Sequence, residues 1–301
     1  MGELDTTPVT RPQVARVTLA AFLAAVVIGG SNFVAVRFSN RELDPLWGAG
    51  SRFVLAALIF AAACAALRLR LPPPRTVVRI AGFGLLAFAA SYGLLYWAMQ
   101  EVPAGVAASV MAAGPLLTLL FATVHRLETL HVRALVGAAV ALLGSVLMFF
   151  QPGDTDFGGL RMAAVCLAAV TAAESVVLAK RIGPVHPVLM NLWGMAAGGV
   201  ALLVASLALR EQWALPREPA TVAAFVYLVA ASVVLFLLVL HVIQRWTASA
   251  SSYVFVLMPP VAVVLGAVLG GEAITTATVL GGLVILTGVY TGALRRTSAA
   301  R

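Results

Sequence analysis

The sequence predicts an all-α integral membrane protein whose ten transmembrane helices form two inverted repeats of five. Three observations support this fold class. Of the 301 residues, 61% are hydrophobic and only 11% are charged, whereas a soluble domain is about half apolar and about a quarter charged. The apolar residues fall in runs of about twenty, which is the helix length that crosses a bilayer core of about 30 Å. The second half of the chain also repeats features of the first.

The apolar runs define the expected helices and the organisation of the chain. Turn residues and charges separate neighbouring runs, as at Gly183-Pro184. The expected spans are 17–37, 46–67, 76–98, 104–124, 131–150, 159–180, 186–209, 219–242, 248–270 and 276–294. They predict a disordered cytoplasmic arm at 1–16, a first five-helix repeat at 17–150, a second, inverted repeat at 159–294 and a cytoplasmic tail at 295–301.

The basic residues indicate topology rather than a nucleic-acid partner. The formal net charge is +8, but the basic residues lie mainly in the short loops between apolar runs. Of the 20 lysines and arginines, fourteen fall on the side that holds both termini and six on the other. The positive-inside rule therefore predicts a multi-pass protein of the bacterial inner membrane with both termini in the cytoplasm.

Neither a metal nor a cofactor is expected. The two cysteines, Cys64 and Cys166, lie inside apolar runs and have no metal-ligand spacing around them. No Walker motif is present, so the chain does not itself hydrolyse ATP. Any transport must therefore draw on a substrate gradient or a coupled ion.

An internal repeat appears when the chain is compared with itself at an offset of 144 residues. Several identical residues then coincide: Gln100 with Gln244, Pro115 with Pro259, Glu128 with Glu272, Gly137 with Gly281, and Gly144 with Gly288. Matches of these residue types arise by chance less often than matches of alanine or leucine in such a sequence. Because each half contains an odd number of helices, the second must enter the membrane from the opposite side. Such inverted repeats are typical of secondary transporters.

The repeated segments carry a resemblance to a known family. Each half begins with a helix ending in a basic residue (GGSNFVAVR, AAESVVLAKR), followed by a proline-containing helix start (DPLWGAGSR, HPVLMNLWG). Later come AAGPLLTLLFATVHRLE and LMPPVAVVLGAVLGGE. Over about 17–294 the chain resembles the EamA branch of the drug/metabolite transporter superfamily. The resemblance implies small-metabolite transport, often export of amino acids, and includes a branch of aromatic and hydrophobic amino-acid exporters. The halves differ where Arg52 corresponds to Gly194.

Glu174 is the acidic residue that the sequence singles out, because an ionisable group at membrane depth usually faces a cavity or a partner. One interpretation is that Glu174 binds a substrate amino group or accepts a proton. The other is that it pairs with Arg181 or another base of the inner loops. The sequence leaves both open.

The other candidate binding residues combine polar and aromatic groups within the spans. Tyr92 and Tyr96 share one face of the third helix, with Trp97 beside them, and suit a pocket for an amphipathic metabolite; a belt at the membrane interface is the alternative for Trp97. Ser31 and Asn32 follow two glycines late in the first helix and either line a cavity or pack. Further candidates are Asn191, Trp193, His241 with Phe236 and Gln244 nearby, and Tyr253.

Proline and glycine positions suggest moving and fixed parts. Pro115 and Pro259 are related by the repeat and are candidate hinges, or else static kinks. Gly137 and Gly144, repeated as Gly281 and Gly288, are expected to allow close helix packing rather than ligand contact.

These features favour a secondary transporter that exports small metabolites, with amino acids as the first choice of substrate. Nucleosides, sugars and drugs are alternative substrates. A channel, an intramembrane enzyme or a receptor is less consistent, because the chain shows no filter loop, no catalytic motif and no soluble domain. The expected partners are the substrate and the lipid bilayer; the sequence leaves open a homodimer.

Overall fold

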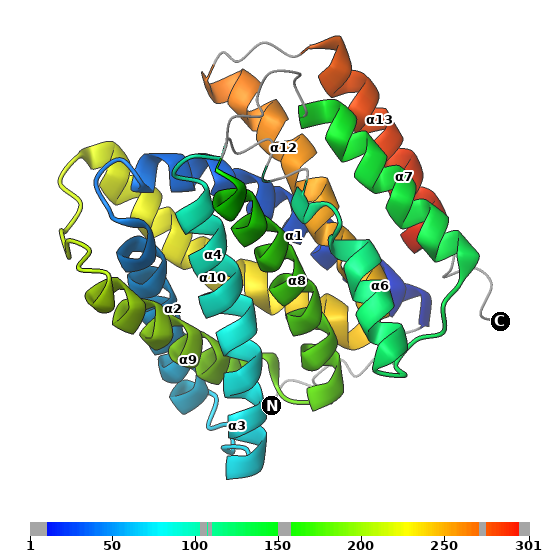
Figure 1. Cartoon of the computed structure of the whole chain (residues 1–301). Helices are drawn as coiled ribbons and strands as arrows, with labels where there is room; N and C mark the ends of the chain where they lie inside the picture. Colours follow the sequence, from blue (N-terminus) through cyan, green and yellow to red (C-terminus); the bar gives the residue numbers. More distant parts are fainter. Residues whose placement is uncertain (1–10, 103–106, 108–109, 150–157, 271–274, 295–301) are drawn as a thin grey trace, which may run out of the picture.

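The structure is a computed structural model that describes residues 11–102, 107, 110–149, 158–270 and 275–294 (Figure 1). Within these ranges every regular element is a helix, so the all-α prediction is confirmed there. The elements are α1 (Arg11–Ser39), α2 (Pro45–Ala66), α3 (Pro74–Gly84), the π-helical η1 (Leu85–Ala90), α4 (Ser91–Ala98), α6 (Gly114–Val124), α7 (Val132–Phe149), α8 (Gly159–Ile182), α9 (Pro187–Ala208), α10 (Pro219–Arg245), α11 (Ala248–Ser251), α12 (Tyr253–Gly270), α13 (Thr276–Val289) and the π-helical η2 (Tyr290–Leu294).

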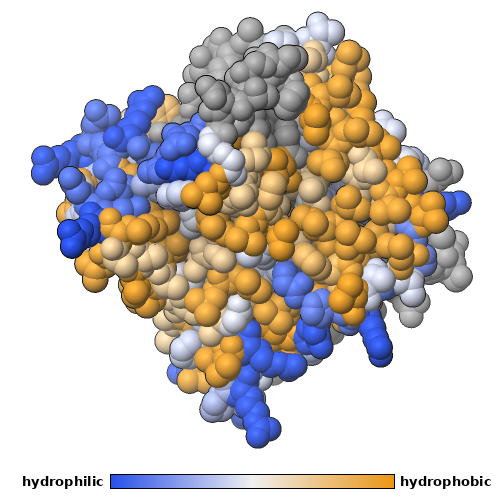
Figure 2. All heavy atoms as spheres, viewed as in Figure 1, coloured by the Kyte–Doolittle hydropathy of each residue, from blue (hydrophilic) through white to orange (hydrophobic). Residues whose placement is uncertain are grey.

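Helix length and hydropathy mark a multi-pass membrane protein. In the described part of the chain, seven helices are long and apolar enough to cross a bilayer, and α3, η1 and α4 together form one of them. Three shorter apolar helices lie at 114–124, 132–148 and 276–292. Hydrophobic side chains cover much of the face seen in Figure 2, with hydrophilic ones gathered towards its edges. Such a surface suits a hydrocarbon environment rather than water.

Several helices begin where the sequence places a proline. Proline occupies the first turn of α2, α3, α9 and α10. The first turn of a helix has no internal partner for its N–H groups, so a residue that lacks this group is tolerated there and its fixed φ favours the helix. These prolines explain why the observed helix starts lie so close to the expected ones.

The structure departs from the expected spans in three places. Residues 11–16, which we assigned to the arm, are already helical in α1. The third span contains the π-helical segment η1, in which the hydroxyl of Ser91 donates to the carbonyl of Leu86. The ninth span is divided at Ser252 into α11 and α12. The described residues exclude part of the expected arm, parts of the fourth and fifth expected spans, Glu272 of the repeat match, and the tail at 295–301.

Close backbone contact joins α7 to α13, as the glycine pattern predicted. A Cβ atom added at Gly288 would lie 2.4 Å from the backbone nitrogen of Ala141 and 2.7 Å from the carbonyl oxygen of Gly137. A Cβ added at Gly144 would lie 2.8 Å from the carbonyl oxygen of Gly281. The expectation that these glycines serve helix packing is therefore confirmed.

The same small-residue packing joins α2 to α9. A Cβ added at Gly199 would lie 3.0 Å from the backbone nitrogen of Val54, and one at Gly50 would lie 3.1 Å from that of Leu203. The remaining helices pack between these two pairs: α1 lies against α10 and α12, and α8 lies against α4 and α6. In Figure 1 the α7–α13 pair and the α2–α9 pair stand at opposite sides of the molecule.

We expect Gly288→Ala to destabilise the protein. The added methyl group has no space against the backbone of α7, and overpacking of this kind costs about 1–3 kcal/mol. Thermal melting of the purified protein in detergent should show a clearly lower Tm for this variant. Gly82→Ala in α3 is the matched control, because no atom lies within 4 Å of its added Cβ. Equal melting temperatures for the two variants would contradict the close packing of α7 and α13.

Candidate functional site

A cavity of about 130 Å³ lies inside the helix bundle. Its walls come from both halves of the chain: α1, α2 and the α3–η1–α4 span from the first, and α8, α10 and α12 from the second. Most of the wall is apolar, and the described residues that line it include no aspartate or glutamate. Pockets for drug-sized ligands measure about 300–1,000 Å³, so this volume suits a small metabolite.

Arg52 of α2 supplies the positive charge of this cavity. Arg52 is 2% exposed, and its guanidinium Nη1 donates a hydrogen bond of 3.2 Å to the hydroxyl of Tyr96. The guanidinium carbon lies 4.6 Å from the ring centre of Phe53 and 5.2 Å from that of Tyr92, distances suited to cation–π attraction. Its Nε has no hydrogen-bond partner, and Arg52 forms no ion pair with a described acidic residue.

Four rings form an aromatic cluster beside Arg52: Phe53 of α2, Phe88 of η1, Tyr92 of α4 and Phe236 of α10. The centres of the Phe88 and Phe236 rings lie 4.8 Å apart, and that of Phe53 lies 5.0 Å from those of Phe88 and Tyr92. The ring pairs are tilted or edge to face, which is the favourable geometry for aromatic contacts. Tyr92 and Phe236 face the cavity directly. The cavity thus combines one cation with an apolar, aromatic wall.

Some of the predicted binding residues meet at this cavity. Asn32, Tyr92 and Tyr96 line it, as does Pro259, which was predicted as a hinge. Asn32 comes from α1 and is 9% exposed, and its side-chain Oδ1 has no hydrogen-bond partner. The two tyrosines share one face of α4 because they are four residues apart.

Other predicted residues lie away from the cavity lining. The Ser31 hydroxyl is bonded to Tyr227 and to the Ile28 carbonyl. Arg245 donates to Nδ1 of His241 at 3.0 Å. Three more predicted residues also lie outside the lining. Asn191 is fully buried, Trp193 packs against the core, and Tyr253 lies against Gly292.

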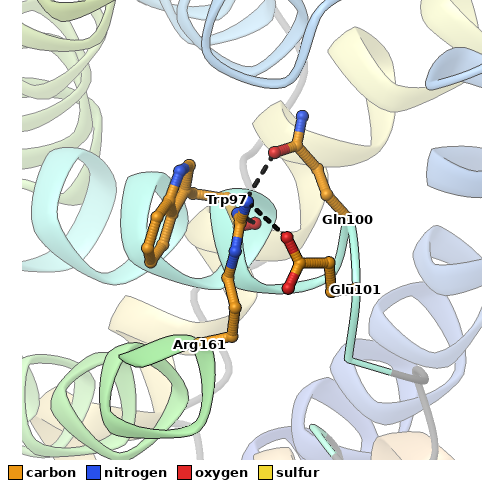
Figure 3. Close-up of polar contacts among 4 residues, drawn as sticks. All are labelled: Trp97, Gln100, Glu101 and Arg161. Atoms are coloured by element: carbon orange, nitrogen blue, oxygen red, sulfur yellow. Dashed lines mark hydrogen bonds and ion pairs between the residues drawn. The ribbon is translucent and has the colours of Figure 1, made fainter. Parts of the chain in front are cut away.

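Trp97 belongs to a polar cluster at the end of α4 (Figure 3). The Arg161 guanidinium lies 3.8 Å from the Trp97 ring centre and donates to the Trp97 carbonyl oxygen. The same guanidinium donates to Gln100 at 3.2 Å and pairs with Glu101 at 2.8 Å. Since Arg161 stands at the start of α8, this cluster fastens the end of α4 to α8. Trp97 therefore lies in an inter-helix clamp outside the cavity lining.

Glu174 of α8 also has a protein partner. Nε2 of His125 lies 2.8 Å from its carboxylate, and both side chains are 27% exposed. Arg181 contacts Nδ1 of His125 at 2.7 Å. Because arginine only donates, Nδ1 accepts and Nε2 carries the hydrogen that Glu174 accepts. The chain Arg181–His125–Glu174 joins the end of α6 to α8, next to but outside the cavity lining.

The two predicted hinge prolines have different surroundings. Pro115 is in the first turn of α6, where its missing N–H leaves no helical bond unmade. Pro259 and Pro260 lie inside α12, where they remove two helical hydrogen bonds. The α12 helix therefore has a weak point beside the cavity.

Carboxylates at the helix ends tie the two halves together. Glu211 accepts from the backbone N–H groups of Leu46 and Trp47, at the start of α2, at 3.1 and 2.8 Å. Glu42 accepts from the N–H groups of Glu218 and Arg217, just before α10, at 3.0 and 3.1 Å. The bond from Glu218 is the main cause that lowers the pKa of Glu42 below its usual value. Both carboxylates satisfy N–H groups that helix starts leave unpaired.

These features describe a multi-pass membrane protein built around a small internal cavity. The chain matches the EamA-like transporter family at residues 16–150 and again at 160–291, and it belongs to that family. The resemblance seen in the sequence is thereby confirmed. The family is one of transporters, not enzymes.

Curated relatives and a solved structure support this placement. The chain is 31% identical over 258 residues to "Uncharacterized inner membrane transporter YedA" of Escherichia coli strain K12, covering 85% of this chain and 83% of the relative. It is 28% identical to "Probable terminal-alkyne amino-acid exporter" of Streptantibioticus cattleyicolor, covering 84% and 85%. A solved structure described as "Crystal structure of protein" aligns with a TM-score of 0.77 over 91% of this chain and 97% of that one; at 19% identity it shows the fold alone.

Arg52 is the charged residue of the cavity lining, and sequence reasoning did not select it as a binding residue. It was noted as a difference between the halves, not as a binding residue. The available signal was a basic residue well inside an apolar span, which is as costly at membrane depth as the acid of Glu174.

We expect Glu174→Gln to lower the transport rate and to change its dependence on pH. Glutamine still accepts from His125 but, unlike a carboxylate, it can neither carry a negative charge nor take up a proton. Transport by reconstituted protein in acidic and neutral buffer would measure the effect. Glu101→Gln is the control that should keep the wild-type pH profile, because Glu101 follows α4 and pairs with Arg161 at the opposite end of α8 from Arg181. If both variants follow the wild-type profile, Glu174 serves packing alone.

Proposed function

We propose that this protein is a secondary transporter that exports small metabolites, above all amino acids with aromatic or hydrophobic side chains, across the bacterial inner membrane by alternating access. The observation that carries the proposal is the cavity between the two halves, where a buried arginine meets an aromatic wall and no acidic residue lines the described surface. An amino acid with an apolar side chain matches both parts of this wall. Names of relatives agree: one is called an amino-acid exporter and one an inner membrane transporter.

The proposal includes ten membrane crossings arranged as two inverted five-helix repeats, with both termini in the cytoplasm. The packing of the helices supports it. Under the 144-residue offset α2 corresponds to α9 and α7 to α13, and each of these packs against its own counterpart. The contact of α1 with α10 corresponds in the same way to that of α8 with α4, and the contact of α1 with α12 to that of α8 with α6. A two-fold relation between the halves produces this pattern.

Transport by purified protein in proteoliposomes tests the function. We expect labelled phenylalanine or leucine to cross the membrane faster than in protein-free liposomes and to be competed by other hydrophobic amino acids. Nucleosides and sugars, as the control substrates, should neither cross nor compete. Transport of a nucleoside or a sugar with no transport of any amino acid would contradict the proposed substrate class.

The proposed alternating access makes a prediction for the two prolines. We expect Pro115→Ala and Pro259→Ala to favour states that open to opposite sides, because the repeat places the two positions in opposite gates. The measurement is labelling of a single cysteine at Ala172, which lines the cavity, in a background without Cys64 and Cys166. Labelling from the two sides should shift in opposite directions in the two variants.

The Gly82→Ala variant is the control for this experiment, because no atom lies within 4 Å of the Cβ added at Gly82. Its cysteine at position 172 should be labelled as in the protein without the alanine substitution. If both proline variants shift in the same direction, or if neither shifts while transport continues, the prolines are static kinks and the symmetric gating model fails.

A further inference from the structure

The charge of Arg52 is almost uncompensated by the protein. A guanidinium cannot lose its proton in a protein, so burial does not remove the charge. Its partners are neutral hydroxyls, those of Tyr96 and Tyr92, and the faces of aromatic rings. A buried charge is normally paired, since an unpaired one costs several kcal/mol. The fold therefore retains a cation whose natural counter-ion is absent from the described residues around it.

Arg52 has unfilled hydrogen-bonding capacity and is also part of the cavity wall. Nε of Arg52 has no hydrogen-bond partner, and the residue is part of the cavity wall. A guanidinium presents its N–H groups as a planar fork that fits a carboxylate with two parallel hydrogen bonds. A small anion of this shape that enters the cavity would supply the missing counter-charge.

A second unfilled group on the same wall has the opposite character. Oδ1 of Asn32 is a buried acceptor without a partner, and Asn32 lines the cavity from α1. One ligand that satisfies both groups must carry an anion for Arg52 and an N–H donor for Asn32. The zwitterion of an α-amino acid carries both on one carbon atom.

The second half of the chain provides no duplicate of this site. When the proline-containing starts of α2 and α9 are aligned, Gly194 of α9 stands where the first half has Arg52, and a Cβ added there would lie 3.1 Å from the ring of Phe83 and 3.4 Å from that of Phe88. Aromatic side chains thus occupy the space that a second cationic side chain would need. Arg52 is the one lysine or arginine among the described residues that line the cavity, which suits one carboxylate per chain.

We propose that Arg52 determines substrate specificity by binding the free carboxylate of the transported molecule, while Asn32 accepts from its amino group and the aromatic cluster contacts its side chain. This inference rests on the proposed function and refines it. It makes the carboxylate obligatory: amides, esters and decarboxylated amines of the same amino acids should be rejected. The lack of any acidic side chain in the described lining explains why an amine alone, which is a cation, is excluded.

Transport of phenylalanine, phenylalaninamide and phenethylamine by proteoliposomes tests this specificity. Wild-type protein should transport phenylalanine and reject the other two. Arg52→Gln should lower phenylalanine transport by about tenfold to a hundredfold, the loss expected for a charge-assisted pair, and should abolish the preference over the amide. Arg52→Lys should retain part of the rate, because a lysine keeps the charge but not the fork.

Binding to detergent-purified protein, measured as a thermal shift, separates the two roles and does not depend on turnover. The carboxylate of 3-phenylpropanoate should stabilise wild-type protein but not Arg52→Gln, whereas Asn32→Ala should bind 3-phenylpropanoate and phenylalanine equally. Because Arg52→Gln also removes a buried charge, its unliganded Tm shows whether it is folded. If the Arg52→Gln variant is not folded, the Arg52→Lys variant provides the same test.

The outcomes distinguish this inference from the function on which it rests. If wild-type protein transports phenylalaninamide as well as phenylalanine, or if Arg52→Gln and Arg52→Lys keep the wild-type preference, the carboxylate role is overturned while amino-acid transport stands. If no amino acid is transported but 3-phenylpropanoate binds through Arg52, the substrate class of the proposed function fails and the carboxylate site remains.

Discussion

The structure depends on how helices associate when lipid, not water, surrounds them. Lipid chains are as apolar as leucine, so burying an apolar face against another helix gains little, and association relies on close van der Waals contact. The chain meets this constraint with glycines that bring backbones together. A Cβ added at Gly199 of α9 would lie 3.0 Å from the backbone nitrogen of Val54 in α2, and one at Gly288 of α13 would lie 2.4 Å from that of Ala141 in α7. The α2–α9 and α7–α13 pairs are therefore the fixed framework.

The helices between these two pairs contact one another but enclose a cavity. Its walls come from α1, α2, the α3–η1–α4 span, α8, α10 and α12. The ends of this framework are fastened by polar contacts of the Glu42 and Glu211 type, in which a carboxylate of one segment satisfies the first turn of a helix far away in the sequence. Glu42 and Glu211 thus serve helix ends and Glu174 pairs with His125, whereas the cationic Arg52 has no carboxylate partner among the described residues.

Much of the fold followed from the sequence because the bilayer sets helix lengths. The expected spans 46–67 and 186–209 differ by about a residue at each end from α2 and α9. The π-helical segment η1 and the break at Ser252 did not follow, since they depend on backbone bonds that hydropathy does not encode. The ten-crossing inverted arrangement remains a proposal that the helix packing supports.

The candidate site was predictable only in part. Tyr92 and Tyr96 follow from spacing along one helix, but the rotation of that helix relative to its neighbours is a tertiary property. The apolar residues of α8 lie on all faces of the helix, so the sequence pattern did not show which way Glu174 points, and the structure places it against His125. Arg52 was visible as a charge, yet its significance depends on Tyr96, a residue 44 positions away in the sequence.

The most direct test of the central claim is an experimental structure of the protein with a hydrophobic amino acid bound, such as phenylalanine. The account predicts the ligand in the cavity between the halves, with its carboxylate within hydrogen-bond distance of the Arg52 guanidinium and its ring against Tyr92 and Phe236. A ligand bound elsewhere in the bundle, or one whose carboxylate points away from Arg52, would contradict it.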